Sequence, residues 1–164
     1  MPTWPTQAEC DSFYGDPRGP NGGPSQKWIR ENLVRVTTPF RMTFDGKPVS
    51  GIQIHKKCAE SLARVFAGIW VASGHNQAVI EQWGVDKFGG SFNYRLMRGL
   101  DRLSMHAYGC AIDLDPARNG LGNAKPHFRE CPLVIDAFAG EGWVWGGSWP
   151  TRPDGMHWQA ARVK

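Results

Sequence analysis

The sequence has no hydrophobic run that approaches the roughly 18 residues needed for a membrane-spanning helix. Its opening stretch, MPTWPTQAECDSFYGDP, also lacks the basic segment followed by an apolar one that marks a secretory signal. These absences argue against an integral membrane protein and against export through a cleavable signal. We therefore expect a chain that is made in the cytoplasm without a signal peptide and that has no stable membrane association.

Cysteine is scarce, and its spacing excludes two common kinds of site. The four cysteines are Cys10, Cys58, Cys110 and Cys131. None of them forms a CxxC pair, so neither a zinc ribbon nor a thioredoxin-like active site is present. Four reduced thiols are expected in the cytosol. A Cys10–Cys58 disulfide stays open for a protein that works outside it.

The sequence also lacks a large excess of positive or negative charge. Nineteen Lys and Arg residues against 15 Asp and Glu residues give a net charge of +4, and the basic residues form no run. This balance slightly favours polyanionic partners such as nucleic acid, anionic lipid or bacterial cell wall. Because there is neither a basic stripe nor a recognised nucleic-acid-binding motif, we expect no nucleic-acid partner.

The residues that are present suffice for one folded domain. The 164 residues include 41% hydrophobic ones, and 20 Gly and 12 Pro predict many loops. Residues 55–72 carry apolar side chains at three- and four-residue steps, which predicts an amphipathic helix. Residues 1–24, rich in Pro and Gly, predict an irregular arm held to the core by Trp4, Phe13 and Tyr14.

Shorter patterns predict the remaining elements. Further helices are expected at residues 26–32, after the N-cap Ser25, at 76–83 and at 131–139. Short strands are expected in LVRV, GCAIDLD, WVW and MHWQA, together with a hairpin that turns at Asp45-Gly46. The overall expectation is a single α+β domain in which helices pack on a small antiparallel sheet.

Histidine is rare, and two of the five histidines stand beside acidic residues. His106 and Asp113 flank an apolar stretch, and an Asp at the end of a buried strand must be paired, hydrogen-bonded or bound to metal. With His157 they make a sufficient ligand set for catalytic zinc, which leaves its fourth position to water. Asp154, three residues before His157, is then placed to take a proton from that water.

Spacing alone leaves a second interpretation open. A histidine near an apolar strand is commonly a hydrogen-bonded core residue, and the Asp of Asp115-Pro116 is typical of a turn. The other histidines have no evident partner. His55 fits a helix N-terminus, His75 belongs to a turn, and His127 lies in a loop after Pro126.

Two motifs carry a resemblance to a known family. SMHAYGCAID resembles the SxHxxGxAxD signature of the zinc D,D-peptidase family, which includes VanY-type D-alanyl-D-alanine carboxypeptidases, VanX-type dipeptidases and phage endolysins that cut the L-alanyl-D-glutamate bond. DGMHW resembles its second signature. FGGSFNYR is similar to the segment that supplies an active-site Arg, and WVWGGSW to a stretch of the phage-type members. The resemblance covers about residues 55–160.

The resemblance implies roles for individual residues. One zinc ion per chain would be bound by His106, Asp113 and His157. Asp154 would be the general base and then the acid, although many family members have Glu there. Arg95 would stabilise the oxyanion or hold a substrate carboxylate, which a guanidinium suits by its charge and its fork of donors. Arg98 and Arg102 are alternatives for this role, but Arg102 is more typical of a solvated surface charge.

Other residues are candidates for substrate contact, namely Ser104, Tyr94, Arg98 and Trp149. Ser104 would form a hydrogen bond near the first ligand or to the substrate. Trp149 offers an aromatic face to a sugar ring or a peptide, whereas Trp145 and Trp158 are expected in the core or beneath the site. For Tyr94, packing in the core or at the rim is an equally open alternative.

The sequence therefore predicts a monomeric zinc metallopeptidase whose partner is bacterial peptidoglycan. Within the family, the missing signal favours a phage or prophage endolysin with L-alanyl-D-glutamate endopeptidase activity. Such an enzyme is made in the host cytoplasm and reaches the wall in the periplasm after the membrane is permeabilised. Two alternatives stay open: a D-alanyl-D-alanine carboxypeptidase, and a non-catalytic wall-binding or virion structural protein that keeps the fold.

Overall fold

The computed structural model describes residues 1–164, and its C-terminal half contains a four-stranded antiparallel sheet. Its strands lie in the order β5-β6-β8-β7, with bounds Phe88–Gly90 (β5), Ala111–Leu114 (β6), Val144–Trp145 (β7) and His157–Gln159 (β8). Two smaller antiparallel pairs precede it: β1 (Leu33–Val36) with β4 (Ile52–His55), and β2 (Thr43–Phe44) with β3 (Lys47–Pro48). The fold is α+β, as expected from the sequence.

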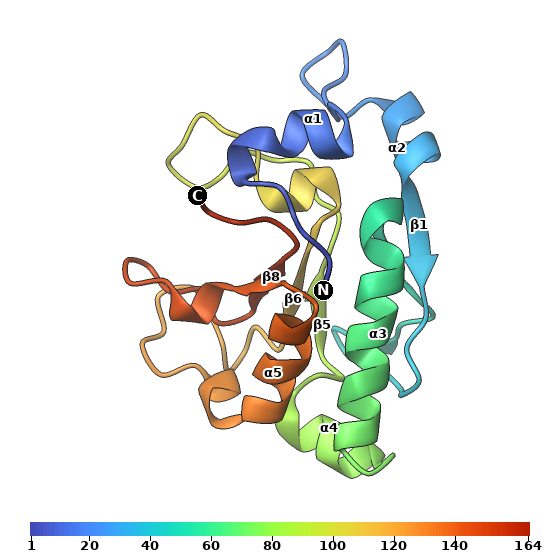
Figure 1. Ribbon diagram of the computed structural model, residues 1–164, viewed down its shortest axis with the longest axis vertical. Helices are drawn as coiled ribbons and strands as arrows, with labels where there is room; N and C mark the ends of the chain where they lie inside the picture. The colour runs from blue at the N-terminus through green and yellow to red at the C-terminus, as the bar shows by residue number, and fades with distance from the viewer.

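The helices surround these sheets. They are α1 (Cys10–Tyr14), α2 (Gln26–Asn32), α3 (Lys56–Ala72), α4 (Gln77–Trp83) and α5 (Pro132–Gly140). Short 3-10 helices connect them, namely η1 (Gln7–Glu9), η2 (Met105–Tyr108), η3 (His127–Glu130) and η4 (Gly146–Ser148). Figure 1 shows α3 between β1 on one side and the four-stranded sheet with α5 on the other.

The register between β6 and β8 decides what each face of the sheet carries. Asp113 pairs with His157, and Ile112 pairs with Trp158. Directly opposed residues project to the same face of an antiparallel pair, and neighbours along a strand project to opposite faces. The polar pair therefore shares one face. The apolar pair faces the core, where the Trp158 ring stacks on Phe138 of α5 at 4.2 Å between centroids.

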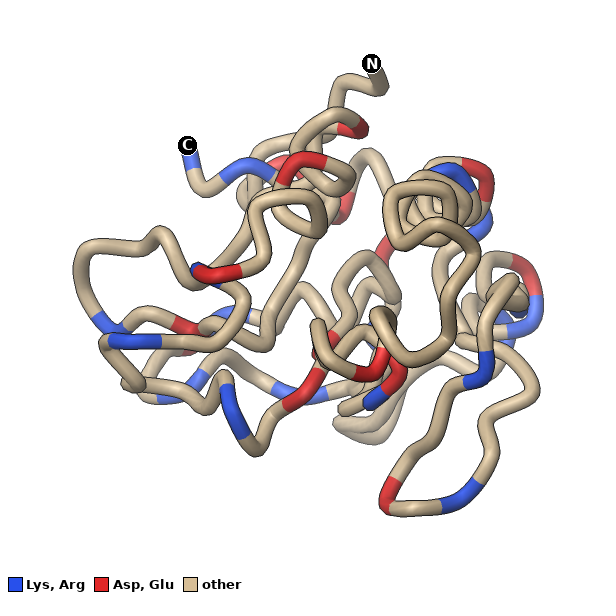
Figure 2. The backbone as a smooth tube through the Cα atoms, turned by 90° about the horizontal axis from the view of Figure 1, so that it is seen from below, with Lys and Arg blue, Asp and Glu red and all other residues tan.

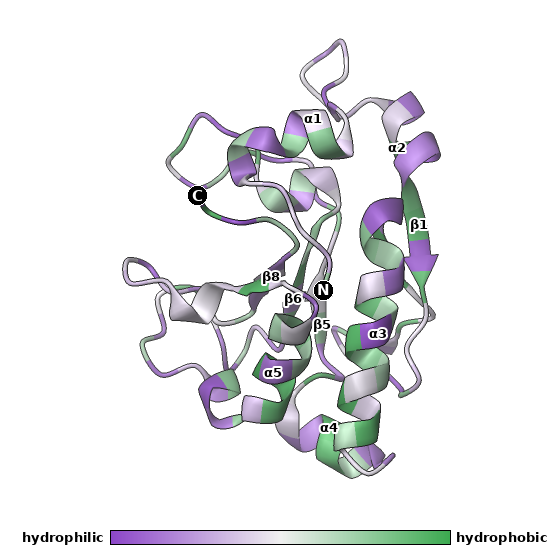
Figure 3. Cartoon of the chain, viewed as in Figure 1, coloured by the Kyte–Doolittle hydropathy of each residue, from purple (hydrophilic) through white to green (hydrophobic).

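Helix α3 forms because its sequence repeats apolar residues at helical spacing. Its buried side chains include Leu62, Val65, Phe66 and Ile69. Figure 3 shows hydrophobic and hydrophilic residues alternating along this helix, as its position against the core requires. The predicted N-cap Ser25 accepts a hydrogen bond from the backbone N–H of Trp28 at 3.2 Å, and Gly84 ends α4 in the left-handed conformation.

Two features of the N-terminal half differ from the sequence-based expectation. Strand β4 was not expected, because its four residues run directly into α3 and their alternation is too short to stand out beside the helical pattern. The arm of residues 1–24 is less irregular than expected, since it contains η1 and α1. The anchoring of the arm is as expected for Trp4 and Tyr14, which are both buried.

The cysteines are buried and free, so the structure contains no disulfide. Burial raises the pKa of Cys58 to about 12, which keeps its thiol protonated and unreactive near neutral pH. No helix has both the length and the apolar character needed to cross a membrane.

Candidate active site

A short capped turn brings the first candidate ligand into the interior. The Oγ of Ser104 accepts a hydrogen bond from the backbone N–H of His106 at 3.2 Å and so begins η2. Gly109 ends this turn at a φ of 66°, where a side chain would also meet Leu33 Cδ2 at 2.6 Å from its Cβ. The chain then enters β6, which carries Asp113. The SxHxxGxAxD pattern is thus a capped turn, a glycine stop and a buried strand.

Three polar side chains converge at the face of β6 and β8. The Nε2 atom of His106 lies 3.2 Å from the Nδ1 atom of His157. Each of these nitrogens lies 3.3 Å from the Oδ1 atom of Asp113. The three atoms form a nearly equilateral triangle, and both imidazoles are buried. The predicted set of His106, Asp113 and His157 is therefore brought together by the fold.

Hydrogen bonds at the outer nitrogens orient both rings. The Nδ1–H of His106 donates to the carbonyl oxygen of Ser91 at 2.7 Å, and the Nε2–H of His157 donates to the Oε1 of Gln159 at 2.8 Å. In the neutral ring, the nitrogen that does not carry the proton is an acceptor. Both inner nitrogens therefore present lone pairs to the same point as the Asp113 carboxylate. Such outer partners are typical of metal-binding histidines.

The donor set and its spacing fit a zinc ion. The Asp113 Oδ1 is buried and has no hydrogen-bond partner, so with both rings neutral three acceptors face one another. Buried acceptors in this arrangement repel unless a cation or a proton lies among them. Atoms that surround zinc tetrahedrally at about 2.0–2.1 Å are about 3.3 Å apart. The observed edges of the triangle have this length.

The electrostatics of the triad show how strongly the three groups interact. Burial raises the pKa of Asp113, but the two imidazoles outweigh it and leave the pKa below its usual value. Burial lowers the pKa of His157, yet its contact with the Asp113 carboxylate leaves this pKa raised. Positive charge is thus favoured at the centre of the triad, whether a proton or a metal cation supplies it.

Asp154 lies beside the triad on the loop that leads into β8. Its backbone N–H donates to the carbonyl of Gly146 at 2.9 Å, and its carbonyl accepts from the backbone N–H of His157 at 3.1 Å. Its Oδ1 is buried without a hydrogen-bond partner. Burial raises the pKa of this carboxyl group, partly opposed by His157. A carboxylate with a raised pKa and a free oxygen suits proton transfer near neutral pH.

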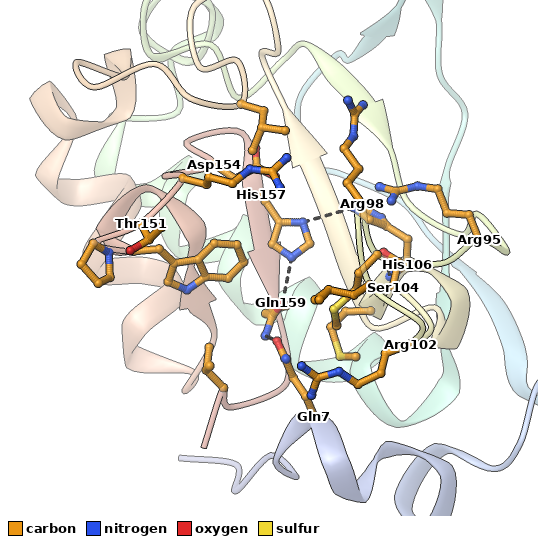
Figure 4. A pocket seen from close by; sticks show the side chains of 18 residues that line it. Gln7, Arg95, Arg98, Arg102, Ser104, His106, Thr151, Asp154, His157 and Gln159 are labelled. Carbon is orange, nitrogen blue, oxygen red and sulfur yellow. Dashed lines mark hydrogen bonds between the residues drawn. The ribbon is translucent and has the colours of Figure 1, made fainter.

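The two histidines of the triad line a cleft with a volume of about 440 Å³. Figure 4 shows His106, His157 and Asp154 together with arginines from the neighbouring loop. The lining contains four arginines, Arg95, Arg98, Arg102 and Arg152, and one carboxylate, Asp154. Figure 2 shows Lys and Arg mixed with Asp and Glu along the chain as a whole. The positive character of this cleft is therefore a local feature that the net charge does not reveal.

Residues 98–160 match a family model described as D-alanyl-D-alanine carboxypeptidase. The match confirms the resemblance to the zinc D,D-peptidase family. The matched segment contains the whole triad and Asp154, whereas Arg95 lies just before it. Comparisons with curated proteins and with solved structures give no match.

Most other residues that the resemblance to the zinc D,D-peptidase family singled out lie at the cleft. Its lining includes Arg95, Arg98, Ser104 and Trp149. The indole of Trp149 lies 5.5 Å from the His157 ring between centroids. Tyr94 does not line the cleft and packs in a half-buried position against the core instead, so the structure gives no support to substrate contact by its ring.

One residue of this cleft was not singled out from the sequence, and another had a signal that could have found it. Arg102, an alternative for the Arg95 role, is exposed as expected for a solvated charge and also lines the cleft. Arg152 lines the cleft as well and was not singled out. Nothing in the local sequence distinguishes Arg152 from other surface arginines. Gln159 had a usable signal, because it stands two residues after His157 in a strand and therefore projects to the same face.

Proposed function

We propose that the protein is a zinc-dependent peptidase that hydrolyses the stem peptides of bacterial peptidoglycan, with the L-alanyl-D-glutamate endopeptidase activity of a phage or prophage endolysin. The observation that carries the proposal is the triangle of two imidazole nitrogens and one carboxylate oxygen at the base of an arginine-lined cleft. A histidine cluster with a purely structural role does not require an open cleft. A non-catalytic binding protein does not require a second buried, unpartnered carboxylate, Asp154, beside the triad.

The three residues of the triad would hold the zinc ion. When bound there, zinc supplies a Lewis acid for the scissile carbonyl and lowers the pKa of a water molecule. Asp154 accepts a proton on its unpartnered Oδ1 and later transfers this proton to the leaving amine. Its raised pKa serves both steps, because a carboxylate that is too acidic returns a proton easily but takes one poorly.

The arginines orient the substrate. Arg95 lines the same cleft as Asp154 and His157, and its charge acts to lower the pKa of Asp154, against the raising effect of burial. In this position it stabilises negative charge on the carbonyl oxygen or holds a substrate carboxylate. The remaining three arginines extend positive charge along the cleft wall. A stem peptide with several free carboxylates is complementary to such a wall.

This distribution of charge favours the endopeptidase over the carboxypeptidase. Release of a terminal D-alanine requires capture of one carboxylate at the end of the substrate, for which one arginine suffices. The L-alanyl-D-glutamate bond is followed by a residue with its own carboxylate and by a further acidic chain. Four arginines along the cleft match the second case better. The match to a model described as D-alanyl-D-alanine carboxypeptidase keeps the other specificity as the second candidate.

Digestion of purified muropeptides tests the proposal. We expect mass spectrometry to show loss of the whole stem peptide beyond L-alanine. Loss of a single terminal alanine would identify the carboxypeptidase instead. A zymogram on cell-wall material separates both enzymes from a non-catalytic wall-binding or virion structural protein, since clearing is expected to disappear with chelator and to return with zinc. Action in the periplasm after membrane permeabilisation is part of the endolysin assignment and depends on it.

A further inference from the structure

Gln159 connects the metal-binding triad to the N-terminal arm. Its side chain is 1% exposed, and each of its polar atoms has a partner. The Oε1 atom accepts from the Nε2–H of His157 at 2.8 Å, and the Nε2 atom donates to the carbonyl of Ala161 at 2.8 Å and to the Oε1 of Gln7 at 3.0 Å. Figure 4 shows Gln159 between His157 and Gln7.

The partners of Gln159 fix which way its amide points. A backbone carbonyl can only accept, so the amide nitrogen must be the group that faces Ala161. The amide oxygen must then face His157, and the His157 nitrogen opposite it must carry the proton. The other ring nitrogen, Nδ1, is consequently left as a lone pair directed at the triad. The amide of Gln159 thus selects the tautomer of His157 that is able to bind a metal ion.

Gln7 is held in place by the pairing of the two ends of the chain. The backbone N–H of Gln7 donates to the carbonyl of Arg162 at 2.8 Å, and the N–H of Arg162 donates to the carbonyl of Pro5 at 2.8 Å. Figure 1 shows the first segment of the chain near the segment that follows β8. Gln7 also lines the cleft. The arm therefore reaches the metal site although it lies outside the matched residues 98–160.

We propose that Gln159 and Gln7 are positioning residues that prepare His157 for metal binding, so that the N-terminal arm is a functional part of the site. The proposal rests on the zinc site of the proposed function. Gln159 acts directly on the His157 ring, and Gln7 acts through Gln159. Neither residue is expected to touch the metal or the reacting bond.

Zinc affinity, measured by competition with a chromophoric chelator, tests the proposal without reference to activity. Removing an outer partner of a ligating histidine typically weakens metal affinity 10–100-fold, and we expect this loss in Gln159→Leu. Gln7→Leu removes one hydrogen bond from the amide, which corresponds to an about 2–10-fold loss. Gln7→Glu keeps an acceptor for the Gln159 amide and is expected to restore the affinity.

Gln77→Leu is a matched control. The Gln77 amide makes two hydrogen bonds of 3.0 Å with the backbone of Arg41, far from the cleft, and is half-buried like Gln7. Its loss is expected to leave zinc affinity unchanged. The visible absorption of the Co²⁺-loaded protein gives a second measurement, because a reoriented His157 ring changes the ligand field. We expect the spectrum to change in Gln7→Leu and not in Gln77→Leu.

The outcomes separate the two proposals. If the unaltered protein binds zinc and both Gln7→Leu and Gln159→Leu bind it equally well, the positioning role is wrong and the zinc site stands. If the unaltered protein binds no zinc, the metal site and the positioning role are both wrong. If Gln159→Leu fails to fold, the variants of the half-buried Gln7 still test whether the arm positions His157. Unchanged zinc affinity and an unchanged Co²⁺ spectrum in Gln7→Leu would show that the arm has no such role.

Discussion

Two buried histidines, in different halves of the molecule, have opposite environments. His55 caps α3, where its Nδ1 accepts from the backbone N–H of Lys57 at 3.0 Å and its Nε2–H donates to the carbonyl of Tyr14 at 2.9 Å. His106 is equally buried and also donates one N–H to a carbonyl, but its second nitrogen faces two further acceptors, on His157 and Asp113. Both ring nitrogens of His55 have hydrogen-bond partners on the backbone, whereas only one ring nitrogen of His106 does.

This difference teaches how a structural histidine is distinguished from one that is available to a metal ion. Burial does not separate the two, because His55 is 0% exposed and His106 is 3% exposed. The distinction lies in what the second ring nitrogen meets once the first has been used. A donor at that point completes a structural role, and a group of acceptors requires a cation.

The largest expected effect is the difference in zinc binding between an alanine variant of the triad, His157→Ala, and an alanine variant of the structural histidine, His55→Ala. His157→Ala is expected to abolish stoichiometric zinc binding and wall hydrolysis, because two ligands remain of three. His55→Ala should retain one zinc per chain and lose about 1–3 kcal/mol of unfolding free energy, through the lost helix cap and the unpaired Tyr14 carbonyl. Metal analysis and urea unfolding measure the two effects. Loss of zinc in a folded His55→Ala variant would contradict the distinction.

Asp154→Asn should have the next largest effect. The variant keeps the triad and is expected to retain zinc, while activity falls about 10²–10⁴-fold with loss of the proton acceptor. Asp136→Asn, on the exposed side of α5, is the matched control and should remain fully active. Full activity in Asp154→Asn would remove this residue from the mechanism.

The same variant has an expected effect on stability in the metal-free protein. Burial raises the pKa of Asp154, so the folded state holds this proton more tightly than the unfolded state does. The resulting stabilisation is present at low pH and is lost as the pH rises through the folded pKa. Above the folded pKa, the ionised, buried carboxylate therefore destabilises the fold. Asp154→Asn should raise the melting temperature more at high pH than at low pH, and the opposite trend would contradict the environment described for this group.

The smallest effect concerns acid stability and sharpens the comparison of the histidines. Burial lowers the pKa of His55 to about 4, against 6.5 when exposed. The unfolded state therefore takes up the proton first, so this stabilisation is complete above pH 6.5 and is lost towards pH 4, by up to about 3 kcal/mol. His157, whose pKa is raised, acts in the opposite sense in the metal-free protein.

Unfolding of the chelator-treated protein between pH 4 and 8 measures this effect. We expect His55→Gln to flatten the acid side of the stability profile, because the amide does not titrate. An unchanged profile would show that another group controls acid stability.

Several parts of the structure were predictable because their signals are local. The helical repeat of α3 and the caps at Ser25 and Gly84 depend on neighbours within a few residues, and all three were found. Strand β4 was missed because a four-residue strand is stabilised by its partner β1 and not by its own pattern. For Tyr94 the sequence leaves substrate contact and packing in the core or at the rim as alternatives, and only the tertiary structure shows its ring packed against the core.

By itself, the sequence determined the chemical nature of the site: two imidazoles, a carboxylate and a second acid in motifs that resemble one family. Only the tertiary structure decided that these groups meet. His106 and His157 are 51 residues apart, and Gln7 and Gln159 are 152 apart. The pairing of β6 with β8 places Asp113 opposite His157. The physical reason is that motif spacing constrains neighbours along the chain, whereas convergence on one ion depends on strand register and core packing, which the whole chain determines.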